Sequence, residues 1–309
     1  MKKAISLLLT LCMAFSLCVS AFAVSEGQER VVIGADLSED QILSVYSQFA
    51  LVRGSVTELT VTNAEERSYL EGLVSESVIG TRSISCIYIK TLAENSGLTV
   101  STNNISWCSQ DMYKSALMTA GIYDAEVKVG APFSVSGTAA LTGIYKAYED
   151  ITGQKLDEDA KSAAADELVI TAELADALTE AAADQGLSAE DVANEISNAD
   201  AVAIVQELKL ILDETENMTD EELHDQVVTI AAQYGYTLDE SVINKLISLC
   251  RSLEGLSISE LQDKVEKFKS SVATVQEYAE KAASFGEKVS NFFGKIVDAF
   301  RNIFGGGDK

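Results

Sequence analysis

Residues 124–149 read DAEVKVGAPFSVSGTAALTGIYKAYE, and this stretch divides the chain into two parts. Apolar and charged residues alternate over Ala125–Val129, which predicts a half-buried β-strand. Proline has no backbone N–H for a central ladder, so the strand is expected to stop at Gly130–Pro132. Ser136 is then expected to cap a helix, because the apolar residues that follow recur at spacings of three and four.

A second strand and helix are expected near the start of the chain. Val31–Gly34 reads VVIG, a short apolar run typical of a strand. Ser38 and Gln41 have the spacing of a capping box, in which each side chain bonds the backbone N–H of the other. A helix is therefore expected over residues 38–49.

The region between these landmarks predicts a small mixed sheet. Further strands are expected at residues 55–61, 83–91 and 98–107, and helices at 63–74 and 109–120. A turn at residues 95–97 separates the last two strands, so we expect them to pair as a hairpin. The order strand, helix, strand occurs at 31–61 and again at 103–129, which predicts two βαβ-like units.

From Ser136 onward the pattern is helical, and an irregular helical bundle is expected. The expected helices span residues 136–150, 157–183, 188–213, 219–234, 239–254 and 257–304. The predicted fold class is therefore α+β, with the sheet in the N-terminal half and the bundle in the C-terminal half. The expected divisions are a signal peptide (1–23), an α+β domain (24–135), a helical domain (136–254) and a long C-terminal helix with an amphipathic segment (255–309).

Two motifs carry a resemblance to a known family. They read Gly34-Ala35-Asp36-Leu37-Ser38-x-x-Gln41 and Ala131-Pro132-x-x-Val135-Ser136-Gly137-x-x-Ala140-Leu141-Thr142-Gly143-Ile144-x-Lys146-Ala147. With these motifs the chain resembles, over roughly residues 30–250, the secreted bacterial family known as domain of unknown function 1002. The resemblance implies an exported bacterial protein, and it brings no established activity.

The first residues predict an export signal. Lys2 and Lys3 precede the apolar segment Ala4–Val19, and AFA at residues 21–23 fits a cleavage site. The apolar run is short for a bilayer span of about 20 residues, which favours cleavage over a membrane anchor. We therefore expect a protein that is secreted or associated with the cell envelope.

The charge balance excludes one class of partner. The chain has 23 basic and 48 acidic residues, and without Lys2 and Lys3 the net charge is 21 − 48 = −27. Such a surface repels phosphate backbones, so no nucleic-acid partner is expected. It also disfavours adsorption of the whole chain to anionic lipid.

Cysteine usage leaves one question open. Cys86 and Cys108 both lie near strands of the predicted sheet, and in an oxidising compartment they either form a disulfide or remain free thiols. Cys250 lies on an apolar helix face and is expected to be a small buried residue.

Catalytic and metal sites are poorly represented in the sequence. Beyond the expected signal peptide the one histidine is His224, within the acidic run EELHD, and neither a Gly-x-Ser-x-Gly elbow nor a His-Glu-x-x-His helix occurs. No catalytic residue, metal or cofactor is therefore expected. Acidic pairs such as Asp157 with Asp159 are what a glycosidase needs, but helix starts and solvated faces also explain them.

One segment has the chemistry of a ligand site. Ser134, Ser136, Gly137 and Thr138 follow a strand and precede a helix, where free backbone N–H groups can hold an anion. The alternative, which we favour, is that Ser136 caps the helix and Gly137 allows close packing.

The C-terminal segment is amphipathic. Large apolar residues recur on one helix face over residues 284–304, and the members expected to dock are Phe285, Val289, Phe292, Phe293, Ile296, Phe300 and Phe304. Burial against the protein itself, against a protein partner or second copy, or peripherally in a membrane or envelope surface would each cover this face.

Two functions follow from these observations. The first is a secreted or envelope-associated, non-enzymatic binding or interaction protein. The alternative is an extracellular hydrolase that acts on cell-wall or other polymers through paired carboxylates. The scarcity of histidine and of aromatic residues favours the first.

Overall fold

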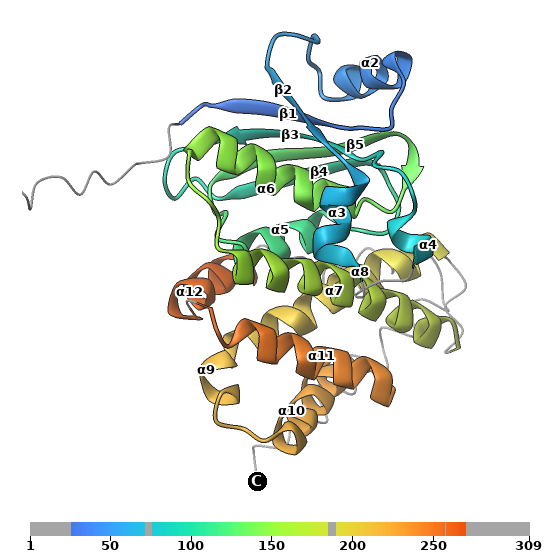
Figure 1. Cartoon of the computed structure of the whole chain (residues 1–309). Helices are drawn as coiled ribbons and strands as arrows, with labels where there is room; N and C mark the ends of the chain where they lie inside the picture. Colours follow the sequence, from blue (N-terminus) through green and yellow to red (C-terminus); the bar gives the residue numbers. More distant parts are fainter. Residues whose placement is uncertain (1–25, 72–75, 185–189, 257, 270–309) are drawn as a thin grey trace, which may run out of the picture.

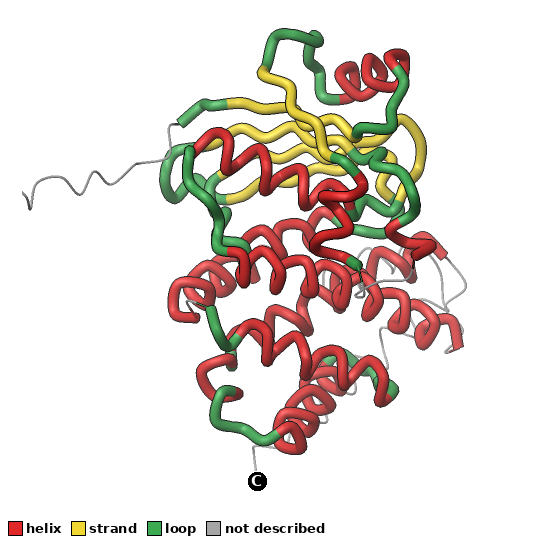
Figure 2. Tube along the Cα trace, in the orientation of Figure 1, coloured by secondary structure: helices red, strands yellow, loops and turns green. Residues whose placement is uncertain are grey.

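The computed structural model describes residues 26–71, 76–184, 190–256 and 258–269. These residues form a five-stranded mixed sheet with α2 on one face and a stack of helices on the other (Figure 1). Away from the sheet, the second half of the described chain consists of helices and connecting loops (Figure 2). The predicted α+β fold class is confirmed.

The strands form one sheet in the order β2-β1-β3-β5-β4. Their bounds are β1 (Glu29–Gly34), β2 (Thr57–Val61), β3 (Cys86–Thr91), β4 (Leu98–Ile105) and β5 (Ala125–Val135). β1 pairs with β2 in parallel, β5 pairs with β4 in parallel, and β3 runs antiparallel to both of its neighbours.

The expected hairpin between the strands at 83–91 and 98–107 is wrong, because β5 lies between β3 and β4. β3 is buried on both faces over most of its length and therefore needs a partner strand on each side. β4 exposes polar residues such as Thr99, Ser101 and Asn103, which suit an edge of the sheet.

Both βαβ units are present, but they are not equivalent. In the first, α2 (Glu39–Gln48) connects β1 to β2, and the capping box of Ser38 and Gln41 is confirmed. In the second, α5 (Gln110–Thr119) connects β4 to β5. α2 packs against Val31, Ile33 and other residues of one sheet face, whereas α5 belongs to the main core on the opposite face.

β5 does not stop at Gly130–Pro132 as expected, and it continues to Val135. The register between β4 and β5 is irregular here, since Asn103 pairs with Gly130 but Ile105 pairs with Val135. Pro132 therefore lies in a bulged segment, where a ladder N–H is not required.

The helix after β5 starts later than expected. α6 (Ala139–Thr152) has Thr138 at its N-cap and no side-chain capping bond, so the prediction that Ser136 caps it is wrong. Ser136 Oγ instead donates to the carbonyl oxygen of Val78, 3.1 Å away. α6 packs on β1, β2 and β3, so the sheet layer extends beyond the expected domain boundary at residue 136.

Gly137 provides the close packing that the sequence suggested. Its φ is +102°, and a Cβ there would lie 2.5 Å from Tyr113 Oη and 2.6 Å from Ile105 Cγ2. The Tyr113 hydroxyl also donates to the carbonyl oxygen of Gly137. The segment between β5 and α6 is thereby fixed against α5 and β4.

The main core extends without interruption from the sheet into the helices below it. The remaining helices are α3 (Asn63–Leu70), α4 (Glu76–Ile79), α7 (Glu158–Asp184), α8 (Glu190–Leu210), α9 (Leu212–Thr215), α10 (Asp220–Gln233), α11 (Glu240–Leu253) and α12 (Ile258–Lys269). Among the described helices, none combines the length and the apolar character needed to cross a membrane.

A buried polar network joins α5 to α7 and α8. Lys209 Nζ lies 2.6 Å from Glu167 Oε1, and both side chains are fully buried. The Lys209 ammonium also donates to the carbonyl and hydroxyl oxygens of Ser115, each 3.1 Å away. Thr119 donates to the other carboxylate oxygen of Glu167. Burial lowers the pKa of Lys209, and the nearby Glu167 carboxylate opposes that shift.

The Cys86–Cys108 disulfide that the sequence left open is not formed in the structure. Cys86 belongs to the small cluster under α2, whereas Cys108 belongs to the main core on the opposite face of the sheet. Both are buried free thiols, as is Cys250. Cys86 belongs to β3, whereas Cys108 lies in the loop between β4 and α5, so the sheet separates the two thiols.

Of the helix expected at residues 257–304, the structure describes α12 (Ile258–Lys269). The amphipathic segment at residues 284–304, with its apolar face, lies outside the described residues.

Replacing Gly137 by alanine should destabilise the fold by roughly 2–4 kcal/mol, because strain at positive φ adds to the clash with Tyr113 and Ile105. Gly121→Ala is the matched control, since Gly121 has φ +83° and nothing lies within 4 Å of its Cβ position. Urea unfolding measures both variants. Equal losses of unfolding free energy in the two would contradict the packing role.

A thiol titration tests the arrangement of the cysteines. The denatured, unreduced protein without residues 1–23 should react at three thiols, because Cys86, Cys108 and Cys250 are free. A count of one thiol would restore the Cys86–Cys108 disulfide and would require the two sheet faces to be rearranged.

Candidate functional site

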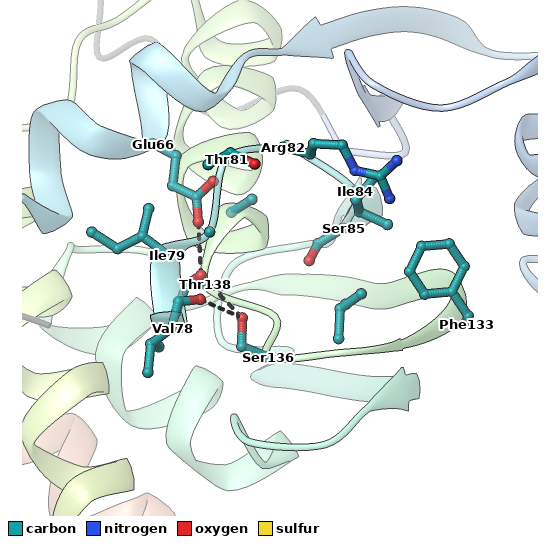
Figure 3. A pocket seen from close by; sticks show the side chains of 13 residues that line it. Glu66, Val78, Ile79, Thr81, Arg82, Ile84, Ser85, Phe133, Ser136 and Thr138 are labelled. Atoms are coloured by element: carbon teal, nitrogen blue, oxygen red, sulfur yellow. Dashed lines mark hydrogen bonds between the residues drawn. The ribbon is translucent and has the colours of Figure 1, made fainter. Parts of the chain in front are cut away.

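A pocket of about 240 Å³ opens at one end of the strands (Figure 3). We call this end of the strands the pocket edge of the sheet. It is formed by α3, the loop between α4 and β3, and the segment from β5 into α6. The lining residues are Glu66, Val78, Ile79, Gly80, Thr81, Arg82, Ile84, Ser85, Phe133, Val135, Ser136, Thr138 and Ala139.

The sheet topology explains why the pocket forms at this edge. β1, β2, β4 and β5 all run in the same direction, so their carboxyl ends meet here, and the antiparallel β3 begins at the same edge. Loops that follow parallel strands converge at this edge, which is where open α/β sheets generally bind ligands.

The carboxyl group of Glu66 lies at one end of the pocket and is almost fully buried, with 1 % of the residue exposed. Thr138 Oγ1 donates to Glu66 Oε1 at 2.7 Å, and Asn63 Nδ2 donates to Glu66 Oε2 at 3.3 Å. Burial raises the pKa of Glu66, and the bond from Thr138 partly opposes that shift.

Glu66 changes the interpretation of the segment predicted to bind an anion. Its carboxyl group lies beside Thr138, the N-cap of α6, where the helix macrodipole favours negative charge. The protein itself therefore supplies an acidic group at this helix start. Sequence reasoning missed Glu66, since 72 positions separate it from Thr138 and only the fold brings them together.

Two of the four residues predicted for ligand binding line the pocket. Ser136 and Thr138 do so, and their hydroxyl groups lie 3.3 Å apart. Gly137 faces Tyr113 and Ile105 instead, and Ser134 is exposed and lies outside the lining.

Arg82 and Phe133 lie at the other end of the pocket (Figure 3). Four other arginines of the described residues form ion pairs: Arg30, Arg53, Arg67 and Arg251. Arg82 is exposed and forms no ion pair with any described residue. Phe133 is 41 % exposed, which is unusual for a large aromatic side chain.

The hydrolase alternative requires two carboxylates in one pocket, and this pocket contains one, that of Glu66. A separate cavity is lined by Asp159 and Asp166, and burial raises the pKa of Asp166. These residues lie seven positions apart on α7, or about 10 Å along the helix axis. The two carboxyl groups lie about 5–5.5 Å apart in retaining glycosidases and about 6.5–9.5 Å apart in inverting ones, and both separations are shorter than the backbone rise between Asp159 and Asp166. Arg251, which also lines that cavity, is engaged by Asp220 and Glu254.

Metal binding receives no support within the part of the chain that the structure describes, where no group of three histidine, cysteine or acidic residues could hold an ion. His224 is partly exposed, and its ring lies 3.3 Å from a carboxylate oxygen of Glu240 on the neighbouring helix.

Comparison with known proteins identifies the family. The model of the family described as "Protein of unknown function (DUF1002)" matches residues 33–273. The chain belongs to the DUF1002 family. It is also similar to "Uncharacterized protein YpuA" of Bacillus subtilis (strain 168), with 36 % identity over 291 residues that cover 93 % of each chain. No solved structure matches.

The motifs that carried the resemblance to DUF1002 act mainly in packing. A Cβ at Gly34 would lie 2.3 Å from the carbonyl oxygen of Ser83, and Asp36 Oδ2 accepts from the Ser83 N–H at 2.8 Å. The end of β1 thus holds the loop that carries Arg82 and Ser85. In α6, a Cβ at Gly143 would lie in ordinary contact with Ile87 and Val32 of the sheet.

A second buried acid lies in the helical half. Asp200 on α8 is 2 % exposed and accepts a hydrogen bond from the Tyr236 hydroxyl at 2.8 Å. Burial raises the pKa of Asp200 from 3.8 to about 7, and the bond from Tyr236 opposes that shift.

Asp200 should make the fold less stable as the pH rises. Between pH 3.8 and 7 the folded state binds the proton of Asp200 more tightly than the unfolded state, so this contribution falls through that range and is constant above it. Between pH 5.5 and pH 8 the loss amounts to roughly 2 kcal/mol. Asp200→Asn should remove it, whereas Asp40→Asn, at an exposed position without an ion pair among the described residues, should not. Urea unfolding at both pH values checks this, and an unchanged pH dependence in Asp200→Asn would contradict it.

Proposed function

We propose that this DUF1002 protein is an exported, non-enzymatic binding protein and that the pocket at the carboxyl ends of the parallel strands is its ligand site. The observation that carries the proposal is the combination of a buried acid, Glu66, with Arg82, which has no acidic partner among the described residues. Polar groups of this kind in a concave site orient a bound molecule.

The lining of the pocket favours binding over catalysis. It combines one carboxyl group with serine and threonine hydroxyls, and it includes neither histidine nor cysteine. The hydroxyl of Ser136 contacts Thr138 and the Val78 carbonyl, neither of which is a general base. Nucleophilic catalysis requires a base within hydrogen-bonding reach of an accessible nucleophile. The Thr138 hydroxyl does reach the Glu66 carboxyl group, but Thr138 is only 2 % exposed.

Export is part of the proposal and is supported by the apolar N-terminal segment and the AFA sequence at residues 21–23. The intact mass of the protein recovered outside the cytoplasm tests it. A chain that begins at Val24 is the expected result. Recovery of the protein only in the cytoplasm, with Met1 retained, would contradict export.

We also propose that the segment at residues 284–304 docks on a protein partner, a second copy or the envelope, on the strength of its single apolar face. Deletion of residues 284–309 tests this. The expected result is that the truncated protein no longer associates with its partner, with a second copy or with the envelope, while its melting curve is unchanged. Loss of thermal stability would show that the segment packs on the protein itself.

Ligand binding is tested by native mass spectrometry. The purified protein is incubated with the low-mass fraction of culture medium and cell-envelope digest, and bound molecules are then identified. Wild type and Arg53→Gln should retain the same small molecule, and Arg82→Gln should lose it. Arg53 is the matched control, because it pairs with Glu58 and does not line the pocket. Absence of any retained molecule in wild type would contradict the binding function.

A further inference from the structure

The two ends of the pocket differ in chemistry. Glu66, Thr138 and Ser136 lie at one end, and Arg82 and Phe133 lie at the other (Figure 3). A ligand that fills the pocket therefore meets an acidic group at one end and a cation with an aromatic ring at the other.

The Arg82 end of the pocket is suited to an acidic group of a ligand. The chain has 48 acidic residues and 23 basic ones, so acidic partners outnumber the lysines and arginines about two to one. Arg82 nevertheless forms no ion pair within the described residues, while the nearby Arg67 pairs with Glu76 at 2.7 Å. A guanidinium presents donors in a planar fork that matches a carboxylate in a bidentate manner.

The Glu66 end of the pocket is suited to a hydrogen-bond donor of a ligand. A carboxylate has about four acceptor positions, and the bonds from Thr138 and Asn63 use two of them. No cation of the described residues is bonded to the Glu66 carboxyl group, since Arg67 acts on it only at a distance and pairs instead with Glu76. An ammonium group from a ligand would offset the cost of burying that charge.

A hydroxyl group without a partner among the described residues lies between the two ends. Ser85 is 3 % exposed and lines the pocket, and its hydroxyl forms no hydrogen bond with the described residues. In Figure 3 its oxygen points toward the interior of the pocket. Because this hydroxyl is open to the pocket and no described residue bonds it, it can bond a polar group of a ligand at mid-length.

We propose that the pocket binds an amphoteric ligand, a free amino acid or a short peptide, with its carboxylate on Arg82 and its amino group at the Glu66 end. This inference rests on the proposed binding function. One acidic and one basic group favour a ligand without net charge. A phosphate dianion would add negative charge beside Glu66 in an already acidic protein. The exposed ring of Phe133 gives an apolar side chain a surface to contact.

Isothermal titration calorimetry tests the ligand class. The panel contains the twenty common amino acids and a set of dipeptides with free ends, in L and D forms, each also prepared with an acetylated amino end and with an amidated carboxyl end. At least one free-ended member should bind saturably. Blocking either end should weaken that binding at least tenfold, since a hydrogen bond to a charged group contributes about 1.5–3 kcal/mol.

Variants connect each end of the ligand to its residue. Arg82→Gln should weaken binding of the free-ended ligand at least tenfold and leave the affinity for its amidated form unchanged. Glu66→Gln should reduce the preference for a free amino end, and Arg53→Gln should match wild type throughout. If Glu66→Gln does not fold, Arg82→Gln and the blocked ligands still test the proposal.

Two results would overturn it. One is the absence of saturable binding by every panel member at millimolar concentration. The other is an equal effect of Arg82→Gln on free and amidated forms. If the panel fails while wild type retains a molecule from the envelope fraction that Arg82→Gln loses, the ligand class is wrong and the binding function stands. If both fail, both proposals fail.

Discussion

The Lys209–Glu167 ion pair constrains the rest of the structure. Removing two charges from water costs several kcal/mol for each ion, and only precise geometry with further hydrogen bonds offsets that cost. Ser115 and Thr119 supply those bonds from α5, which fixes α5 against α7 and α8. Because α5 is the crossover between β4 and β5, the helical half determines the position of one side of the sheet. Tyr113, on the same helix, then holds Gly137 and with it the wall of the pocket.

The sequence predicted what local pattern determines and missed what distant segments determine. Alternation, capping boxes and apolar periodicity located both βαβ units and most helices. The false hairpin shows the limit, because only burial on both faces places β5 beside β3, and no local signal specifies that partner. At the site, Ser136 and Thr138 were recognised from a strand followed by a helix. Glu66 and Arg82 reach the same pocket from separate segments, so only the folded chain groups them.

The DUF1002 motifs in this chain explain how the fold around the pocket is built, and they say less about which ligand it binds. Gly34, Asp36 and Gly137 occupy motif positions and hold backbone segments together around the pocket. Phe133 occupies an unspecified position of the second motif, and Arg82 lies outside both motifs. The motifs therefore do not specify the side chains at the Arg82 and Phe133 end of the pocket, although they specify residues that hold its walls. The motifs alone therefore do not predict the ligand.

The direction of β1 sets the orientation of anything attached to the amino end of the protein. β1 enters the sheet at Glu29 and reaches the pocket edge at Gly34, a path of about 20 Å. Its position between β2 and β3 makes it an interior strand, so this direction is fixed by pairing on both sides. A tag or solid support joined directly before β1 therefore lies at the opposite end of the strands from the pocket. Immobilised in this way, the protein presents its pocket to the solution.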